Sequence, residues 1–492
     1  MTCGFRAGTE PYPDSPRTVP GKRWRCGGAV LVAVHVAILL LSSRFGTDRP
    51  LIERPVLLLV GLEVVAGLVW LAAVWPPTRI LSSWRNVLFM LAVGAILRGL
   101  MLLSTPILED DFWRYLWDGA VVAHGRNPYA HAPQKFLERG GGVPSQSDAL
   151  ERLSHDGQAV VSRINHPSLR TIYPPLTQAA FAVAHWVSPW SLTAWRVVLT
   201  FFDAATVGML LLILQRFGLP CLWAAVYWWN PLLILHGVNG AHMDVLALPF
   251  VLGAILLTLR GRHLWGVACM ALAAGVKLWP VILLPFLLRP LVSRPRRLAA
   301  GLAIAVGLLA LMTWPTLYGV LGANSGFAAY AERWEMNDAL FMALLYGLRA
   351  VVGWFGSPEL APVVARVCAG GLLAGWVAWL VWRPVESGAD LARRMLLAVA
   401  GLFLLSPTQF PWYAIWMLPL LALRPRLSLL LLMVLLSLYH LRYYFDARDT
   451  VAVFDNWLVW GEYVPVWALL VWEGVNDSSK PGACACRVNM QQ

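Results

Sequence analysis

The residues best suited to chemistry are the acidic side chains that directly follow the third apolar run of the sequence. They open the segment Glu109-Asp-Asp-Phe-Trp-Arg-Tyr-Leu-Trp-Asp118. A carboxylate within hydrogen-bond reach of a hydroxyl group can take up its proton, so Asp110 or Asp111 could act as a general base. Only 13% of the residues are charged, and acids in so apolar a chain are costly if they have no function. We therefore interpret the cluster as a site, although Glu109 alone could simply keep a loop solvated.

The spacing within this segment predicts an amphipathic helix. At positions i, i+3, i+4 and i+7, the side chains of Asp111, Arg114, Tyr115 and Asp118 share one helical face. The opposite face carries four apolar or aromatic side chains: Phe112, Trp113, Leu116 and Trp117. We expect a helix that lies on a membrane, with its aromatics among the headgroups and its charged face turned to a cavity, and that ends at Gly119. Arg114, Tyr115 and Asp118 are then candidates for substrate binding.

A second polar group, which contains His242 and Asp244, falls in an expected outer turn between two apolar segments. Both residues are candidates for substrate binding, although Asp244 could instead cap the N-terminus of the helix that follows. The spacing supplies no third or fourth metal ligand beside this pair. We therefore predict no cofactor, and a divalent metal is possible but unsupported.

Other candidates for substrate binding are single polar or aromatic residues at the ends of apolar runs. Lys277 stands three residues before Pro280, where its ammonium could hold a lipid phosphate or could snorkel to the surface. The remaining candidates are Tyr173, Trp412, Tyr413 and Arg442. Tyr173 could instead form a rigid turn with the prolines that follow it, and the neighbouring Trp and Tyr could be aromatic-belt residues. Arg442 could pair with any anionic group.

The composition is that of an integral membrane protein. The 492 residues are 58% hydrophobic with a mean hydropathy of +0.61, whereas soluble domains usually contain about 25% charged residues. Because lipid offers backbone groups no partners, we predict an all-α transmembrane bundle of about 12–14 spans with juxtamembrane helices on its extracytoplasmic side. A disordered cytoplasmic tail is expected over 1–26 and a second cytoplasmic tail over 474–492. The bundle is expected over 27–473, with its main extracytoplasmic loop over 105–172.

The net charge of +12 comes from short Lys and Arg clusters beside apolar runs. This distribution follows the positive-inside rule and lacks the continuous basic stripe of a nucleic-acid-binding protein. Placing the clusters in the cytoplasm puts both termini inside and the acidic segment outside. It also requires residues 263–288 to enter the membrane and return as two short helices, broken at Lys277-Leu-Trp-Pro280.

Taken together, these motifs resemble the GT-C superfamily of polytopic glycosyltransferases. The closest resemblance is to bacterial membrane mannosyltransferase-like proteins that use a polyprenyl-phosphate-linked sugar. The matching stretches are Asp110-Asp-Phe-Trp-Arg-Tyr-Leu-Trp-Asp-Gly119, Gly125-Arg-Asn-Pro-Tyr129, Tyr173-Pro-Pro-Leu176, Asn239-Gly-Ala-His-Met-Asp244, Lys277 with Pro280, and Pro411-Trp-Tyr413. The resemblance implies that one acid of an early extracytoplasmic loop is the base and that basic and polar residues hold the lipid phosphate. It does not choose between Asp110 and Asp111.

We therefore expect a glycosyltransferase in the bacterial inner membrane. It would move a hexose, with mannose as the first guess, from a polyprenyl-phosphate donor to an extracytoplasmic glycan or lipid acceptor. A multi-pass transporter or lipid flippase is the alternative, and acids buried at mid-membrane on discontinuous helices would favour it. A second alternative is a structural subunit of a wall-synthesis complex.

Overall fold

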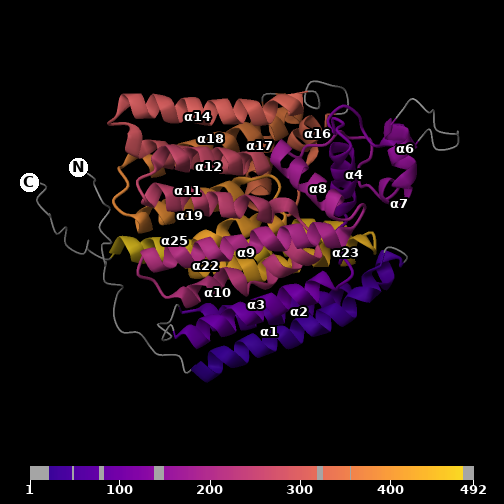
Figure 1. Ribbon diagram of the computed structural model, residues 1–492, viewed down its shortest axis with the longest axis horizontal. Helices are drawn as coiled ribbons and strands as arrows, with labels where there is room; N and C mark the ends of the chain where they lie inside the picture. The colour runs from indigo at the N-terminus through magenta and orange to yellow at the C-terminus, as the bar shows by residue number, and fades with distance from the viewer. Residues whose placement is uncertain are drawn as a thin grey trace, which may run out of the picture.

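A computed structural model describes residues 21–46, 49–76, 83–137, 149–317, 325–354 and 356–479 of the chain. Its long helices run side by side along the long axis of the molecule, and α4 (Phe112–Ala123), α6 (Ala149–Asp156) and α8 (Pro175–Val187) gather at one end (Figure 1). The β-structure of the described residues is one isolated bridge between Met336 and Thr408. The predicted all-α bundle is confirmed.

Seven helices in this part of the chain are long and apolar enough to cross a membrane. They are Trp24–Phe45, Val56–Val74, Trp84–Leu102, Leu192–Arg216, Pro295–Thr316, Ala361–Trp382 and Leu427–Asp446. A pair bent by 101°, Leu233–Asn239 with Met243–Leu259, could supply an eighth span, and four further apolar helices are only 10–17 residues long. A multi-pass membrane protein is therefore confirmed, whereas the count of about 12–14 spans stays a prediction.

The helices at the two ends of the described chain extend beyond the predicted bundle limits. The first helix, α1 (Gly21–Ser42), begins before residue 27 because Trp24 is buried, with its ring stacked 4.5 Å from that of Trp229. The last helix, α25 (Val459–Ser479), continues past residue 473. The rest of the two predicted tails, 1–20 and 480–492, lies outside the described residues.

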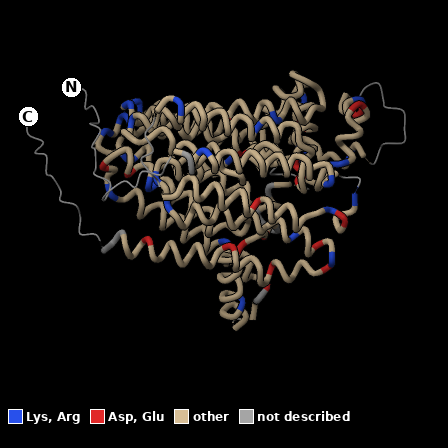
Figure 2. Tube along the Cα trace, turned by 90° about the horizontal axis from the view of Figure 1, so that it is seen from below, with Lys and Arg blue, Asp and Glu red and all other residues tan. Residues whose placement is uncertain are grey.

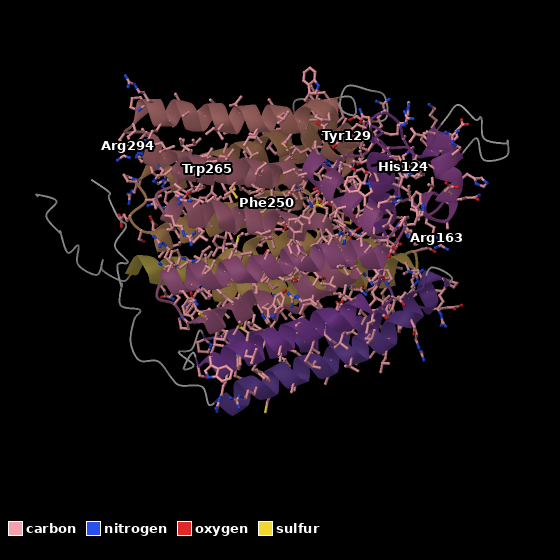
Figure 3. The ribbon with its side chains drawn as sticks, viewed as in Figure 1. His124, Tyr129, Arg163, Phe250, Trp265 and Arg294 are labelled. Carbon is pink, nitrogen blue, oxygen red and sulfur yellow. The ribbon has the colours of Figure 1, made fainter. Side chains whose placement is uncertain are left out.

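Charged residues divide between the two ends of the bundle. Lys and Arg gather at the end away from α4 (Figure 2). Arg294 marks this basic end, whereas His124 and Arg163 lie at the end that carries α4 (Figure 3). This separation agrees with the orientation predicted from the positive-inside rule, and the orientation itself stays a prediction.

The predicted break at Lys277 is present. Helix α12 (His263–Val276) ends where Lys277 adopts an extended conformation, and the chain returns through a 3-10 turn, η6 (Trp279–Leu283), and α13 (Leu284–Leu288). The return brings Arg289 back beside His263, because both residues line one cavity. Lys277 therefore lies at the far tip of a re-entrant hairpin, opposite the basic end.

Helix α4 differs from the prediction in what its two faces contact. Phe112, Leu116 and Trp117 are buried within the protein and do not extend into headgroups, and Arg114 and Asp118 on the other face are buried as well. The cause is that α4 packs against α8 and is covered by the two short helices that follow it, α6 and α7 (Gln158–Val161). The amphipathic pattern was real, but both faces meet protein.

The prediction that α4 ends at Gly119 is wrong. Gly119 instead allows α4 to approach α8 closely. The helix continues to Ala123, and Gly125 with φ +69° follows its end. A Cβ atom built on Gly119 would lie 2.5 Å from the backbone oxygen of Phe181. Only glycine therefore permits this helix spacing.

We expect Gly119→Val to lower the melting temperature of the purified protein, because the clashing atoms are backbone and cannot rotate away. Overpacking of this kind costs about 1–3 kcal/mol. Gly99→Ala in α3 (Trp84–Leu102), where an added Cβ meets no atom within 4 Å, is the matched control and should melt at or above the wild-type temperature. Equal melting of wild-type and Gly119→Val protein would contradict the packing role.

Candidate active site

A hydrogen-bonded clamp holds the segment that leads into the acidic residues. The side chain of Asn239 accepts from the backbone N–H of Ile107 at 2.9 Å and donates to the backbone oxygen of Thr105 at 2.7 Å. Arg196 donates to the backbone oxygens of Ser104, at 2.7 Å, and of Asn239. Both clamp side chains are buried. The turn after helix η4 (Leu233–Asn239) and the start of the acidic loop are thus fixed to each other.

Two residues beside the clamp adopt backbone conformations that non-glycine residues rarely occupy. Leu108 has φ +59° and Ala241 has φ +58°, each directly before a site residue. Such conformations cost about 1–3 kcal/mol each and persist only where surrounding contacts hold them. Trp195 helps to hold the second, since its indole N–H donates to the backbone oxygen of Ala241 at 2.8 Å.

The clamp brings His242 between two of the three successive acids. Its Nε2 lies 3.5 Å from Glu109 Oε2, and its Nδ1 lies 3.8 Å from Asp111 Oδ2. Tyr115 donates its hydroxyl to Asp111 Oδ2 at 3.4 Å, as the shared helical face predicted. Burial raises the pKa of Asp111, an effect that the His242 charge opposes. The Asp111 side chain nevertheless stays 35% exposed, so a ligand can reach it.

Asp110 is more exposed than Asp111, and its side chain contacts Asn165. Its Oδ1 accepts from the side chain of Asn165 at 3.4 Å. The surrounding protein raises its pKa to about 6, and the neighbouring charges of Asp111 and Glu109 add to this shift. A carboxyl group with this pKa changes its protonation close to neutral pH.

Arg114 and Asp118 bind each other and the protein around them. Arg114 Nε lies 3.0 Å from Asp118 Oδ1, and its Nη1 donates to the backbone oxygen of Leu169 at 3.0 Å. Gln178 of α8 donates to the second oxygen of Asp118 at 3.1 Å. Since these bonds occupy both Asp118 oxygens, the arrangement indicates that the pair anchors α4 and gives no support to the predicted contact with substrate.

Lys277 and Asp244 form an ion pair at the tip of the re-entrant hairpin. Lys277 Nζ lies 2.5 Å from Asp244 Oδ1, which also accepts from the Trp416 indole at 2.6 Å. Asp244 makes no helix-capping bond, so that alternative is wrong. The Lys277 side chain is 22% exposed, and its charge is paired within the protein. Lys277 Nζ also lies 4.0 Å from the ring centre of Tyr413. Its charge acts on Asp111 and opposes the rise in the pKa of that acid.

The predicted aromatic candidates line the same region. Trp412 is buried and stacks on the His242 ring at 3.9 Å, so it is not a membrane-belt residue. The Tyr413 hydroxyl lies 3.0 Å from that of Tyr330. Tyr173 meets the Tyr115 ring edge-on at 5.0 Å. Four of the predicted aromatic residues therefore surround the acids and the lysine.

Arg442 is paired within its own segment. Its guanidinium donates two bonds to Asp455, from Nε at 2.9 Å and from Nη2 at 3.3 Å. This pairing satisfies the arginine without a ligand, so the geometry gives no support to its predicted binding role.

Comparison with known proteins identifies the family. Residues 28–293, more than half of the chain, match the family model described as "Alpha-(1->6)-mannopyranosyltransferase, N-terminal domain". The chain belongs to this family. It is therefore a membrane glycosyltransferase of the GT-C type, which confirms the sequence-based expectation of an enzyme.

Two curated relatives carry the same description. "Alpha-(1->6)-mannopyranosyltransferase A" of Mycobacterium tuberculosis is 25% identical over 79% of this chain and 73% of its own length. The protein of the same name from Corynebacterium glutamicum is 23% identical over 64% of this chain and 66% of its own length. No solved structure matches the chain.

Several residues of the candidate site were missed from the sequence. Trp416 lies three positions after Tyr413, so helical spacing alone could have placed both on one face. Gln178, Asn165 and Tyr330 contact site residues across the fold, and no local pattern marks them. Glu109, set aside as a solvating residue, has a side chain only 7% exposed.

We expect the Asp244–Lys277 pair of this family member to act as a unit. Asp244→Asn or Lys277→Met alone leaves one charge without its partner, which costs about 3–5 kcal/mol for a buried pair, and the 22% exposure of Lys277 reduces this. The double variant should therefore melt well above the temperature predicted by adding the two single effects. Melting temperatures of the detergent-purified proteins measure this.

The control is the more exposed pair Glu335–Arg366, whose side chains are 37% and 18% exposed. Glu335→Gln and Arg366→Gln should act additively, because exposed pairs contribute about 0–1 kcal/mol. If the melting-temperature changes at Asp244 and Lys277 are additive as well, their pairing does not stabilise the protein, and the prediction is wrong.

Proposed function

We propose that this protein transfers a mannosyl residue from a polyprenyl-phosphate donor to an extracytoplasmic glycan or lipid acceptor, with a carboxylate as general base. The observation that carries the proposal is the position of Asp111, which is accessible, near His242 and within the electrostatic reach of Lys277. The transferred sugar and an α-(1→6) linkage are taken from the names of the relatives. A base with a cation within its electrostatic reach suits transfer from a donor with an anionic leaving group.

In the proposed step, the base takes the proton of an acceptor hydroxyl group. The hydroxyl oxygen forms a bond to the anomeric carbon while the bond from that carbon to the phosphate oxygen breaks. Polyprenyl phosphate leaves with the electron pair. A single displacement inverts the anomeric configuration. An α-linked product therefore requires a β-linked donor.

Lys277 is our candidate for stabilising the departing phosphate. Its ammonium group has three N–H donors, and Asp244 accepts only one of them. The rings of Tyr413 and Trp416, 4.0 and 5.2 Å from Nζ, hold the side chain in place. A fixed cation of this kind stabilises the charge that develops on the leaving group and removes the need for a general acid.

We assign the role of base to Asp111 rather than to Asp110. Asp111 contacts Tyr115 and His242 and feels the charge of Lys277, whereas Asp110 accepts from Asn165. Burial and the neighbouring charge of Glu109 raise the pKa of Asp111.

We further propose that the site is extracytoplasmic and that both termini are cytoplasmic. The support is the gathering of Lys and Arg at the end of the bundle away from α4. The broken helices around Lys277 are a feature of transporters too. The acids, however, lie in the segment that joins α3 to α4 at one end of the bundle, which favours the transferase.

Asp111→Asn should lower mannosyl transfer by about 10²–10⁴-fold, because an amide cannot accept the acceptor proton. Radiolabelled polyprenyl-phosphate mannose supplied to membranes that contain equal amounts of each variant measures this. Glu386→Gln, an exposed acid at the basic end, is the control and should keep wild-type activity. Wild-type turnover by Asp111→Asn together with loss in Asp110→Asn would reassign the base to Asp110.

The transfer rate should fall as the pH is lowered, and the fall should begin above the ordinary carboxyl pKa of 3.8. A base acts only when ionised, and burial with the charge of Glu109 raises the pKa of Asp111, so the base is protonated at a higher pH than a free carboxyl group. Initial rates between pH 5 and 8 at saturating donor test this, with the membranes returned to neutral pH to check for reversibility. A rate that stays constant down to pH 5 would contradict the raised pKa of the base.

A further inference from the structure

Three imidazole rings and two carboxylates gather behind the acidic loop, in the interior of the bundle. They belong to Glu63, Glu109, His236, His242 and His440. The rings of His236 and His440 stack at 5.3 Å, and that of His242 lies 6.2 Å from His236. All three histidines are at most 3% exposed. The proposed sugar transfer gives no role to His236 or His440.

Several polar atoms of this cluster have no hydrogen-bond partner. They include Glu109 Oε1, His236 Nδ1, His440 Nε2 and both ring nitrogens of His242. Buried polar atoms are almost always bonded, and each orphan costs about 1–3 kcal/mol. So many unpaired polar atoms at one place indicate a binding site for a ligand that would bond to several of them.

The orphans have the composition of a metal site. One ligand atom from each of Glu109, His236 and His440 can be chosen so that all three lie within 4.8 Å of one another. Two imidazoles and one carboxylate form a ligand set known from zinc enzymes, in which further positions stay open for water or substrate. Calcium and magnesium prefer oxygen ligands, whereas imidazole suits zinc and other late transition metals.

A supporting carboxylate completes the arrangement. His440 Nδ1 lies 2.9 Å from Glu63 Oε2 of α2 (Val56–Val74), so a neutral His440 that donates there leaves its Nε2 lone pair available to a metal ion. Metal-bound histidines almost always have such a partner on the second ring nitrogen, which fixes the tautomer. His242, with Nε2 3.5 Å from Glu109 Oε2, is placed to contribute a fourth ligand.

We propose that Glu109, His236 and His440 bind a divalent transition-metal ion of the zinc type. Such an ion would join three segments that are distant in sequence: the acidic loop, helix η4, and helix η11 (Leu436–His440). It would also offset the charge of Glu109, which stands next to Asp110 and Asp111. The site rests on its own residues and does not depend on the identity of the transferred sugar.

Metal analysis of the full-length protein tests the proposal. The protein is purified in detergent, treated with a chelator, reconstituted with zinc chloride or cobalt chloride, and freed of excess metal. We expect about one metal ion per chain and, with cobalt, the visible absorption bands of a four- or five-coordinate ion with nitrogen ligands. Wild-type protein that retains no metal and gives no bands would overturn the proposal.

Variants locate the site. Glu109→Gln, His236→Gln and His440→Gln should each lower the retained metal at least 10-fold while keeping a monodisperse elution profile. His35→Gln is the matched control, because this histidine is also buried but bonds to the Leu31 oxygen of its own helix. Metal retained equally by all four variants would place the ion elsewhere and overturn the assignment. If a histidine variant fails to fold, Glu109→Gln and the cobalt spectrum of the wild type still decide.

Discussion

The site depends on a buried amide that holds two distant backbones together. Asn239 bonds to the chain at Thr105 and Ile107, and Arg196 ties the carbonyl groups of both segments to α9 (Leu192–Arg216). In a membrane interior, water cannot satisfy backbone groups that leave a helix. The clamp satisfies them with side chains, and irregular backbone can therefore exist where the acids and His242 must meet.

The same constraint explains why the irregular segments of the chain converge at this site. The bend after η4, the break at Lys277 and the turn at Pro411 each interrupt a helix, and each places a polar or aromatic side chain beside the others. Lys277 at the second interruption pairs with Asp244, which follows the first, and Asp244 also accepts from Trp416, which follows the third. An uninterrupted helix would have placed its side chains at regular spacing along its axis, and the interruptions let these three side chains meet.

Buried charge elsewhere in the bundle serves packing. Arg98 lies 2.6 Å from Asp203, which also accepts from the Tyr227 hydroxyl at 2.6 Å. Arg98 further donates to the backbone oxygen of Trp228. Both Asp203 oxygens are thus bonded within the protein. The histidine and glutamate cluster differs from this network because four of its ring nitrogens lack partners, whereas the Asp203 network leaves only Arg98 Nη2 without one. This difference supports the proposed metal site.

Sequence alone determined the class of the protein and pointed to the segment in which we propose its chemistry. Apolar runs imposed helices, since lipid permits little else, and the resemblance pointed to a glycosyltransferase with its acids at 109–111. The helical period correctly placed Tyr115 beside Asp111, and the hairpin break at Lys277 followed from Pro280 and the positions of the basic clusters. These features are local, or follow from composition, so a linear pattern contains them.

Only the tertiary structure decided which polar groups pair internally and which remain for a ligand. Asp118 and Arg442 seemed equivalent to Lys277 as candidates, yet Asp118 also accepts from Gln178 and Arg442 pairs with Asp455, and sequence spacing singled out neither partner. Glu109 and His440 come together from opposite parts of the chain, which no spacing rule foresees. The physical reason is that the electrostatic energy of a charge in a low-dielectric bundle depends mainly on its nearest partners. Folding brings those partners together from distant parts of the chain.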